Sequence, residues 1–255
     1  MVDYREFLKT VASYVPTTLT ETIGNYAAVR ECKALLPPEY VVRDRAMYFR
    51  RIAEVLGGSD VRLLFLEFGV WRGESLRQWT TLNRNPKSRF YGFDSFAGLP
   101  EQWRSRPAGH FNLNGEAPRF EDPRVVLVPG WFNQTLAETF GSMDVDDGAT
   151  VLVHIDADLY SSALYCLGFF AGRLERFHVM FDEFGAGEGR ALRDVCVAWG
   201  AGFKPILGLK RTRHSTIPTR VFGEFVCAAG GGKPRMEKHS GTEPGPDASR
   251  HRGGR

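Results

Sequence analysis

The sequence predicts an α/β fold with a doubly wound, mostly parallel β-sheet, a terminal antiparallel hairpin and an N-terminal helical extension. Two observations predict it. Five short apolar runs alternate with amphipathic stretches between residues 61 and 199, as is typical of a parallel sheet covered by helices on both faces. Beyond Trp199 two apolar runs flank a polar connection, which indicates an antiparallel pair. Five strand–helix units followed by a hairpin make the expected core Rossmann-like.

Residues 1–60 are predicted to form a helical cap. Apolar residues recur at helical spacing between Tyr40 and Leu56, the Gly57-Gly58 pair ends this segment, and Pro37-Pro38 breaks any helix before it. The same zone is a candidate surface for a homodimer.

Residues 61–228 are predicted to form the core. Its strand candidates are Arg62–Glu67, Arg89–Phe93, Arg124–Val128, Thr150–Ile155 and Phe177–Phe181. The helix candidates between them lie near Ser75–Asn83, Gln134–Phe140, Ser162–Leu174 and Gly189–Trp199. The hairpin strands are Phe203–Lys210 and Arg220–Cys227, joined by Arg211–Thr219.

The composition excludes several classes of protein. The chain has 255 residues, of which 43% are hydrophobic and 25% charged, as in a globular protein rather than a disordered or fibrous one. No apolar run reaches the roughly 18 residues of a membrane span, and the N-terminus lacks the features of a secretory signal. The four cysteines form no Cys-x-x-Cys pair, which favours free thiols in a reducing compartment. We therefore expect a cytoplasmic protein without membrane contact.

Residues 229–255 are rich in glycine, proline, serine and charge, and they are predicted to form a disordered basic tail. This tail carries the whole formal net charge of +3, so the rest of the chain is neutral. Because a neutral fold has no electrostatic footprint for nucleic acid, nucleic acid is not an expected partner.

Ligands of an open parallel sheet bind at the carboxyl ends of its strands. The first predicted strand ends in Glu67-Phe-Gly69-Val-Trp-Arg-Gly73-Glu-Ser75. Gly69 permits a tight turn, Gly73 lets the next helix start against the strand, and Glu67 is costly there unless it pairs with a group such as a ligand amine. The middle glycine of a dinucleotide fingerprint is missing, which disfavours a NAD-dependent oxidoreductase.

The second predicted strand is followed by Asp94-Ser95. An acid at this distance beyond a glycine turn is where such folds hold a ribose diol, although a turn or N-cap aspartate is the common alternative. Together with Glu67, Gly69 and Gly73, Asp94 suits a nucleoside that lacks phosphate and carries an amine-bearing chain. S-adenosyl-L-methionine fits that description.

The third predicted strand is followed by Gly130-Trp131-Phe132. An aromatic pair after a glycine can flank an adenine ring or simply pack in the core, and the residues leave both interpretations open.

Four carboxylates follow the fourth and fifth strands: Asp156, Asp158, Asp182 and Glu183. Left bare at adjacent strand ends, they would repel one another strongly, so either a divalent cation neutralises them or their protonation is coupled. His154, just before them, is expected to be a buried histidine with a satisfied hydrogen bond rather than a ligand or a base.

Together these segments resemble the macrocin O-methyltransferase (TylF-type) family of class I S-adenosylmethionine-dependent methyltransferases. The most particular run is Tyr91-Gly-Phe-Asp-Ser-Phe-Ala-Gly-Leu-Pro-Glu101. The other segments that carry the resemblance are Leu66-Glu-Phe-Gly-Val-Trp-Arg-Gly-Glu-Ser75, Gly130-Trp-Phe132, His154-Ile-Asp-Ala-Asp-Leu-Tyr-Ser-Ser162 and Phe181-Asp-Glu-Phe184.

The resemblance implies an O-methyltransferase that acts on a sugar hydroxyl of a glycosylated natural product, with Mg²⁺. Asp158 would be the base, and Asp156 would serve the reaction as a metal ligand, joined by Asp182 and by Glu183, which stands where the family usually has aspartate. The residues that it implies for the cofactor are Glu67, Gly69, Gly73, Ser75, Asp94, Ser95, Gly130, Trp131 and Phe132.

Two other functions remain open. Asp156-Ala-Asp158 matches the Asp-x-Asp pattern with which metal-dependent glycosyltransferases hold a nucleotide diphosphate. A non-catalytic cofactor-binding or scaffold protein would keep the fold without the reaction. The expected partner of the enzyme is a small hydroxylated, sugar-containing acceptor.

Overall fold

The computed structural model describes residues 17–36, 41–143, 145, 148–210 and 218–227. The tail predicted for residues 229–255 lies outside this range, as does the start of the predicted helical cap. The helices are α2 (Thr17–Leu35), α3 (Arg45–Val55), α4 (Glu74–Leu82), α5 (Phe132–Ser142), α6 (Tyr160–Ala171) and α7 (Glu188–Trp199), with a short 3₁₀ turn η2 (Phe184–Ala186). The strands are β1 (Val41–Val42), β2 (Leu63–Phe68), β3 (Arg89–Asp94), β4 (Val125–Pro129), β5 (Thr150–Ile155), β6 (Arg176–Phe181), β7 (Gly202–Leu209) and β8 (Arg220–Val226).

The strands of the described residues form one sheet in the order β1-β7-β8-β6-β5-β2-β3-β4. All neighbouring pairs from β6 to β4 are parallel, whereas β8 runs antiparallel to both β6 and β7. The chain leaves β2 toward β3 and β4 and then crosses back to β5 and β6, so the strand order reverses between β2 and β5. The predicted Rossmann-like, mostly parallel fold with a terminal antiparallel pair is confirmed.

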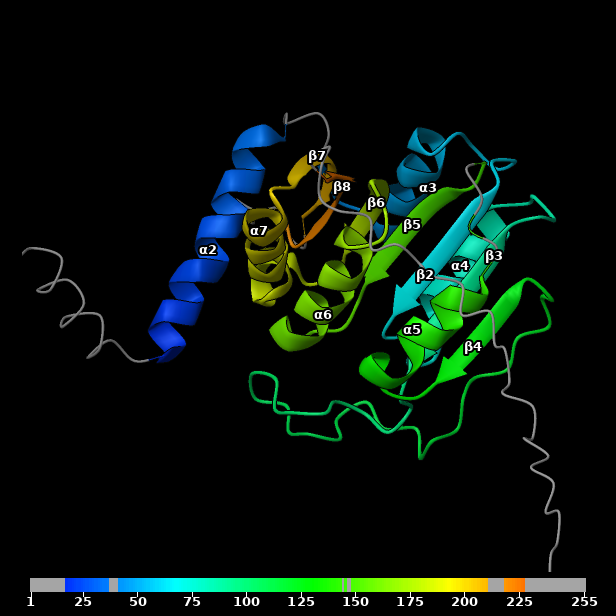
Figure 1. The fold of residues 1–255 in the computed structure, drawn as a ribbon, viewed down its shortest axis with the longest axis horizontal. Helices are drawn as coiled ribbons and strands as arrows, with labels where there is room; N and C mark the ends of the chain where they lie inside the picture. Colours follow the sequence, from blue (N-terminus) through cyan, green and yellow to red (C-terminus); the bar gives the residue numbers. More distant parts are fainter. Residues whose placement is uncertain (1–16, 37–40, 144, 146–147, 211–217, 228–255) are drawn as a thin grey trace, which may run out of the picture.

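Alternation along β2 explains why helices cover both faces of the sheet. Leu64, Leu66 and Phe68 join the core on the side of α5, α6 and α7, whereas Leu63 and Phe65 join the core on the side of α3 and α4 (Figure 1). Every residue of β2 is buried, as expected of a central strand that is covered on both faces.

The N-terminal segment differs from the prediction in one respect. The helix expected from Tyr40 starts at Arg45, because Asp44 caps it by accepting a hydrogen bond from the backbone N–H of Met47 at 2.7 Å. Val41–Val42, two β-branched residues ahead of that cap, instead form a short parallel edge strand against β7.

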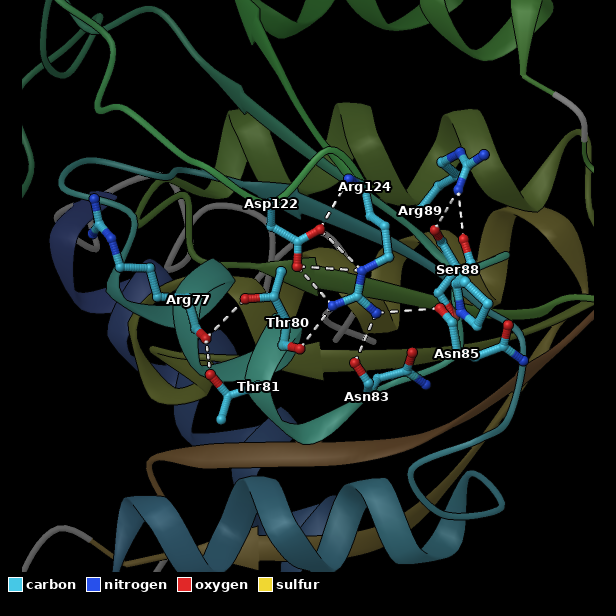
Figure 2. Close-up of polar contacts among 10 residues, drawn as sticks. Arg77, Thr80, Thr81, Asn83, Asn85, Ser88, Arg89, Asp122 and Arg124 are labelled. Carbon is cyan, nitrogen blue, oxygen red and sulfur yellow. Dashed lines mark hydrogen bonds and ion pairs between the residues drawn. The ribbon is translucent and has the colours of Figure 1, made fainter.

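A half-buried arginine, Arg124, ties α4 to the start of β4, at the amino ends of the strands (Figure 2). The guanidinium of Arg124 donates to the carbonyls of Thr80, Asn83 and Asn85, and it forms an ion pair with Asp122 at 2.7 Å. Two carbonyls at the C-terminal end of α4, those of Thr80 and of the capping residue Asn83, thereby gain partners.

No helix of the described residues is long and apolar enough to cross a membrane. All four cysteines carry free thiols, and those of Cys32 and Cys166 are buried.

Candidate active site

A cavity of about 220 Å³ opens at the carboxyl ends of the strands, at the point where the strand order reverses. This is where an open α/β sheet binds its ligands. The predicted site residues that line it are Gly69, Ser75, Asp94, Ser95, Trp131, Phe132, Asp156, Asp158 and Asp182. Four other predicted residues, Glu67, Gly73, Gly130 and Glu183, are not part of the lining.

The turn after β2 depends on two glycines. Gly69 has φ 93°, and a Cβ placed on it would come within 2.0 Å of the backbone oxygen of Asp156, so the loops after β2 and β5 meet here without room for a side chain. Gly73, with φ 75°, precedes α4, and a Cβ there would meet the ring of Phe120 at 2.5 Å. The tight turn and the helix start that the sequence predicts are both present, and both need glycine.

Asp94 fastens this turn to β3. Its Oδ2 accepts hydrogen bonds from the backbone N–H groups of Val70 and Trp71, both at 2.8 Å, and its Oδ1 accepts one from Phe96 at 2.7 Å. A carboxylate oxygen can accept two hydrogen bonds, so Oδ1 keeps capacity for a donor in the cavity. The hydroxyl of the neighbouring Ser95 bonds within its own turn: it accepts from the N–H of Ala97 and donates to the carbonyl of Gly98.

The two aromatic residues after β4 line the cavity, and Phe132 also packs edge-on against Phe68 in the core, with 5.3 Å between ring centroids. The packing interpretation therefore holds for Phe132, whereas contact with an adenine ring stays a prediction. A second hollow adjoins the cavity at Trp131 and Phe132, and its further lining is Pro100, Asn133, Gln134, Ser161, Ser162 and Tyr165.

Glu67 lies beneath the cavity and pairs with a histidine. Its Oε1 is 2.8 Å from Nδ1 of His154, on the neighbouring position of β5, and both side chains are at most 1% exposed. Burial raises the pKa of Glu67, while the contact with His154 works in the opposite direction. The predicted buried histidine thus has a partner at Nδ1, whereas His154 Nε2 and Glu67 Oε2 have none among the described residues.

The carboxyl group of Asp158 has a pKa well above its ordinary value. Burial, followed by the charges of Glu183 and Asp182, raises its pKa to about 7. Its backbone has φ 62°, a conformation that is uncommon outside glycine and that turns this residue into the cavity wall. A carboxyl group with a pKa near neutrality can both accept and release a proton at physiological pH.

The predicted magnesium ligands do not gather into a set of oxygen donors. The two oxygens of Asp182 accept hydrogen bonds from Nε and Nη2 of Arg220. A carboxylate oxygen of Glu183 lies 3.6 Å from the guanidinium of Arg104. Burial raises the pKa of Asp182, but the hydrogen bonds and the charge of Arg220, together with the charges of His154 and Arg45, outweigh burial and leave this pKa below its usual value.

Within the described part of the chain, one trio of potential metal ligands has its atoms within 4.8 Å of one another, and this trio is Glu67, His154 and Asp156. A histidine nitrogen that already pairs with a carboxylate does not suit Mg²⁺, which prefers oxygen ligands in octahedral geometry. The structure therefore does not support the expectation of Mg²⁺.

Three arginines that the sequence did not single out line the cavity: Arg45, Arg72 and Arg220. Arg45, at the start of α3, donates from Nη2 to the hydroxyl of Ser75 at 3.0 Å. Arg220 reaches the site because β8 inserts next to β6 and runs antiparallel to it, so its first residue lies where the other strands end. Arg220 can be assigned to the site only when the position of β8 in the sheet is known, and no pattern in the sequence gives that position.

No protein-family model matches the sequence, and no curated protein matches it. Among solved structures, the O-methyltransferase from Bacillus cereus in complex with SAH is similar to this chain with a TM-score of 0.44 and 14% identity, over 87% of this chain and 96% of that one. The O-methyltransferase TomG from Streptomyces achromogenes, involved in tomaymycin synthesis and in complex with SAM, has a TM-score of 0.41 and 14% identity over 80% and 90% of the two chains. The SAH-bound methyltransferase PaMTH1 from Podospora anserina has a TM-score of 0.39 and 11% identity over 90% and 98%. Each likeness concerns the overall fold alone.

Proposed function

We propose that this chain is an S-adenosylmethionine-dependent O-methyltransferase that acts on a hydroxyl of a small, sugar-containing acceptor. The observation that carries the proposal is that the Gly69 turn, Asp94 and Asp158 line one and the same cavity. A glycine turn, an acceptor for a ribose diol and a base for a hydroxyl are the parts that such a reaction needs.

The cavity residues fit the parts of this cofactor in order. Gly69 and Ser75 line the part of the cavity that suits the methionine part, and the remaining capacity of Asp94 Oδ1 suits a ribose hydroxyl. Trp131 and Phe132 offer faces for the adenine ring, with amide and hydroxyl side chains in the adjoining hollow for its polar edge. When bound, the cofactor supplies an electrophilic methyl group.

The task that remains for the protein is to align a hydroxyl and remove its proton. Asp158 stands in the wall of the same cavity as Asp94, with a pKa of about 7. General-base catalysis of this kind contributes about 10²–10⁴-fold to the rate, and alignment of the two reactants contributes several kcal/mol more. The sugar as acceptor rests on the resemblance of the run from Tyr91 to Glu101.

Calorimetry tests the cofactor. Purified protein is titrated with S-adenosylhomocysteine and, separately, with UDP in the presence of Mn²⁺. We expect heat for the first ligand and none for the second. Heat with UDP and Mn²⁺ but none with S-adenosylhomocysteine would point to a glycosyltransferase. Folded protein that binds neither ligand would rule out the proposal.

Mass spectrometry then tests the transfer. Incubation with S-adenosylmethionine and a panel of glycosides should add a methyl group to at least one of them. The Asp158→Asn variant should bind S-adenosylhomocysteine yet lose the transfer, and the exposed Asp60→Asn variant should keep both activities. Cofactor binding without transfer to any glycoside in the panel would reject the sugar as acceptor.

A further inference from the structure

The carboxylates that follow β5 and β6 already have a cation among them, the guanidinium of Arg220. It donates two hydrogen bonds to Asp182, from Nε to Oδ1 and from Nη2 to Oδ2, the latter at 2.7 Å. The two side chains are 22% and 10% exposed, and both residues line the cavity with Asp156 and Asp158. A planar fork that grips a largely buried carboxylate at two points is among the stronger ion pairs in proteins.

The topology of the sheet dictates this position. Val221 of β8 pairs with Phe181 of β6 in antiparallel register. Arg220, the residue before Val221, therefore lies opposite Asp182, the residue after Phe181, at the carboxyl end of β6. Asp156 lies at the same edge, directly after the neighbouring strand β5. The arginine therefore stands among the residues in which the sequence predicts a magnesium ion.

We propose that Arg220 takes the place at the acceptor site that a divalent cation would hold, so that this chain binds no metal there and transfers a methyl group without one. This inference rests on the proposed function. The contacts to Asp182 use two of the five N–H donors of a guanidinium, and the remaining donors can orient a hydroxyl of the acceptor beside Asp158. Arg220 also offsets the negative charge of Asp182, so that this carboxylate is occupied and Asp158 remains available to take the proton.

The first test measures metal binding and needs no acceptor. The wild-type protein and the Arg220→Gln variant are titrated with Mn²⁺ and followed by electron paramagnetic resonance of the free ion. We expect Arg220→Gln, which leaves the carboxylates without their cation, to bind Mn²⁺ at least about tenfold more tightly than the wild type, in which no stoichiometric site should be detected. The gain should disappear in the double variant Arg220→Gln/Asp182→Asn.

A matched control lies on the same two strands. Arg176 of β6 pairs with Glu224 of β8 at 2.8 Å, at the opposite edge of the sheet. The Arg176→Gln variant also removes an arginine–carboxylate pair, yet it should gain no Mn²⁺ site. Stoichiometric Mn²⁺ binding by the wild type that is lost on Asp182→Asn would overturn the proposal, as would an equal gain in the control.

The second test measures transfer. The rate of methyl transfer by the wild type should persist in EDTA. The rate of Arg220→Gln should be about 10²-fold lower, and added Mg²⁺ or Mn²⁺ should restore part of it. If Arg220→Gln does not fold, Arg220→Lys retains the charge without the fork and should show the same loss with no gain of Mn²⁺ binding. Activity that EDTA abolishes would overturn the proposal. If S-adenosylhomocysteine does not bind at all, the proposed function fails, and the titrations with Mn²⁺ still decide whether Arg220 excludes a metal.

Discussion

Oε1 of Glu67 lies 2.8 Å from Nδ1 of His154, and neither side chain reaches solvent. The two residues are neighbours in the register of β2 and β5, on the face that α3 and α4 cover. Aromatic rings surround the pair, with the centroids of Phe49 and Phe65 at 6.4 and 6.0 Å from the imidazole. Such a pair in an apolar layer is costly to break, because the remaining partner loses its hydrogen bond without access to water.

We therefore predict that Glu67→Leu lowers the free energy of unfolding by about 3–5 kcal/mol. The double variant Glu67→Leu/His154→Phe removes both polar groups, and it should be less destabilised than the sum of the two single variants by about 1–3 kcal/mol. Urea unfolding of all four proteins measures this coupling. Strictly additive effects would show that the two side chains do not depend on each other.

A second prediction concerns the pH dependence of methyl transfer. Because the pKa of Asp158 is raised to about 7, this carboxyl group is protonated at pH 6 and cannot act as a base there. The ratio kcat/KM should fall about tenfold per pH unit below pH 7 and level off above it. In Asp158→Asn this dependence should vanish together with about 10²–10⁴-fold of the activity. A profile of unchanged shape in the variant would assign the base to another residue.

The same shift predicts how stability depends on pH. The pKa of Asp158 is higher in the folded protein than its ordinary value of 3.8, so the stability that its protonated form contributes is complete below about pH 4 and is lost as the pH rises through about 7. Asparagine is neutral at every pH and has no such loss. The Tm of Asp158→Asn relative to wild type should therefore rise between pH 4 and pH 7 and then stay constant. A constant difference across this range would mean that Asp158 ionises as it does in water.

A pair of glycine variants tests the turn after β2. Gly69 and Gly58 have similar backbone angles, φ 93° and 88°, yet a Cβ on Gly69 would collide with the backbone of Asp156, whereas a Cβ on Gly58 would have nothing within 4 Å. Gly58→Ala should cost only the strain of its backbone, about 1–2 kcal/mol, and leave the affinity for S-adenosylhomocysteine unchanged. Gly69→Ala should cost about 3 kcal/mol or more and weaken that affinity, because the loops after β2 and β5 must separate. Equal effects in calorimetry and thermal unfolding would mean that the collision is relieved elsewhere.

The sequence predicts the core strands within a residue or so because each is a continuous apolar run between polar breaks. It also predicts that Asp94 and Asp158 lie at one edge, since all parallel strands end there. The sequence does not reveal which side chains on different strands contact one another, because these contacts depend on the order and register of the strands. The contact of Arg220 with Asp182 exists only because β8 inserts beside β6, and the pairing of Glu67 with His154 depends on the register between β2 and β5. Both contacts join residues that are distant in the chain, and no local pattern records them.

The last prediction separates stability from function at the amino ends of the strands. The side chain of Arg124 is 14% exposed, and its guanidinium bonds carbonyls at the end of α4 together with Asp122. The side chain of Arg84, by contrast, makes one long contact, 3.4 Å, to the hydroxyl of Ser59. Lysine keeps the charge but cannot reach all these acceptors at once, so Arg124→Lys should lower the free energy of unfolding by about 2 kcal/mol. Arg84→Lys should change it by less than about 0.5 kcal/mol. Because both residues lie far from the carboxyl ends of the strands, neither variant should alter the affinity for S-adenosylhomocysteine, and a weakened affinity in Arg124→Lys would show that the position of α4 is transmitted to the cavity.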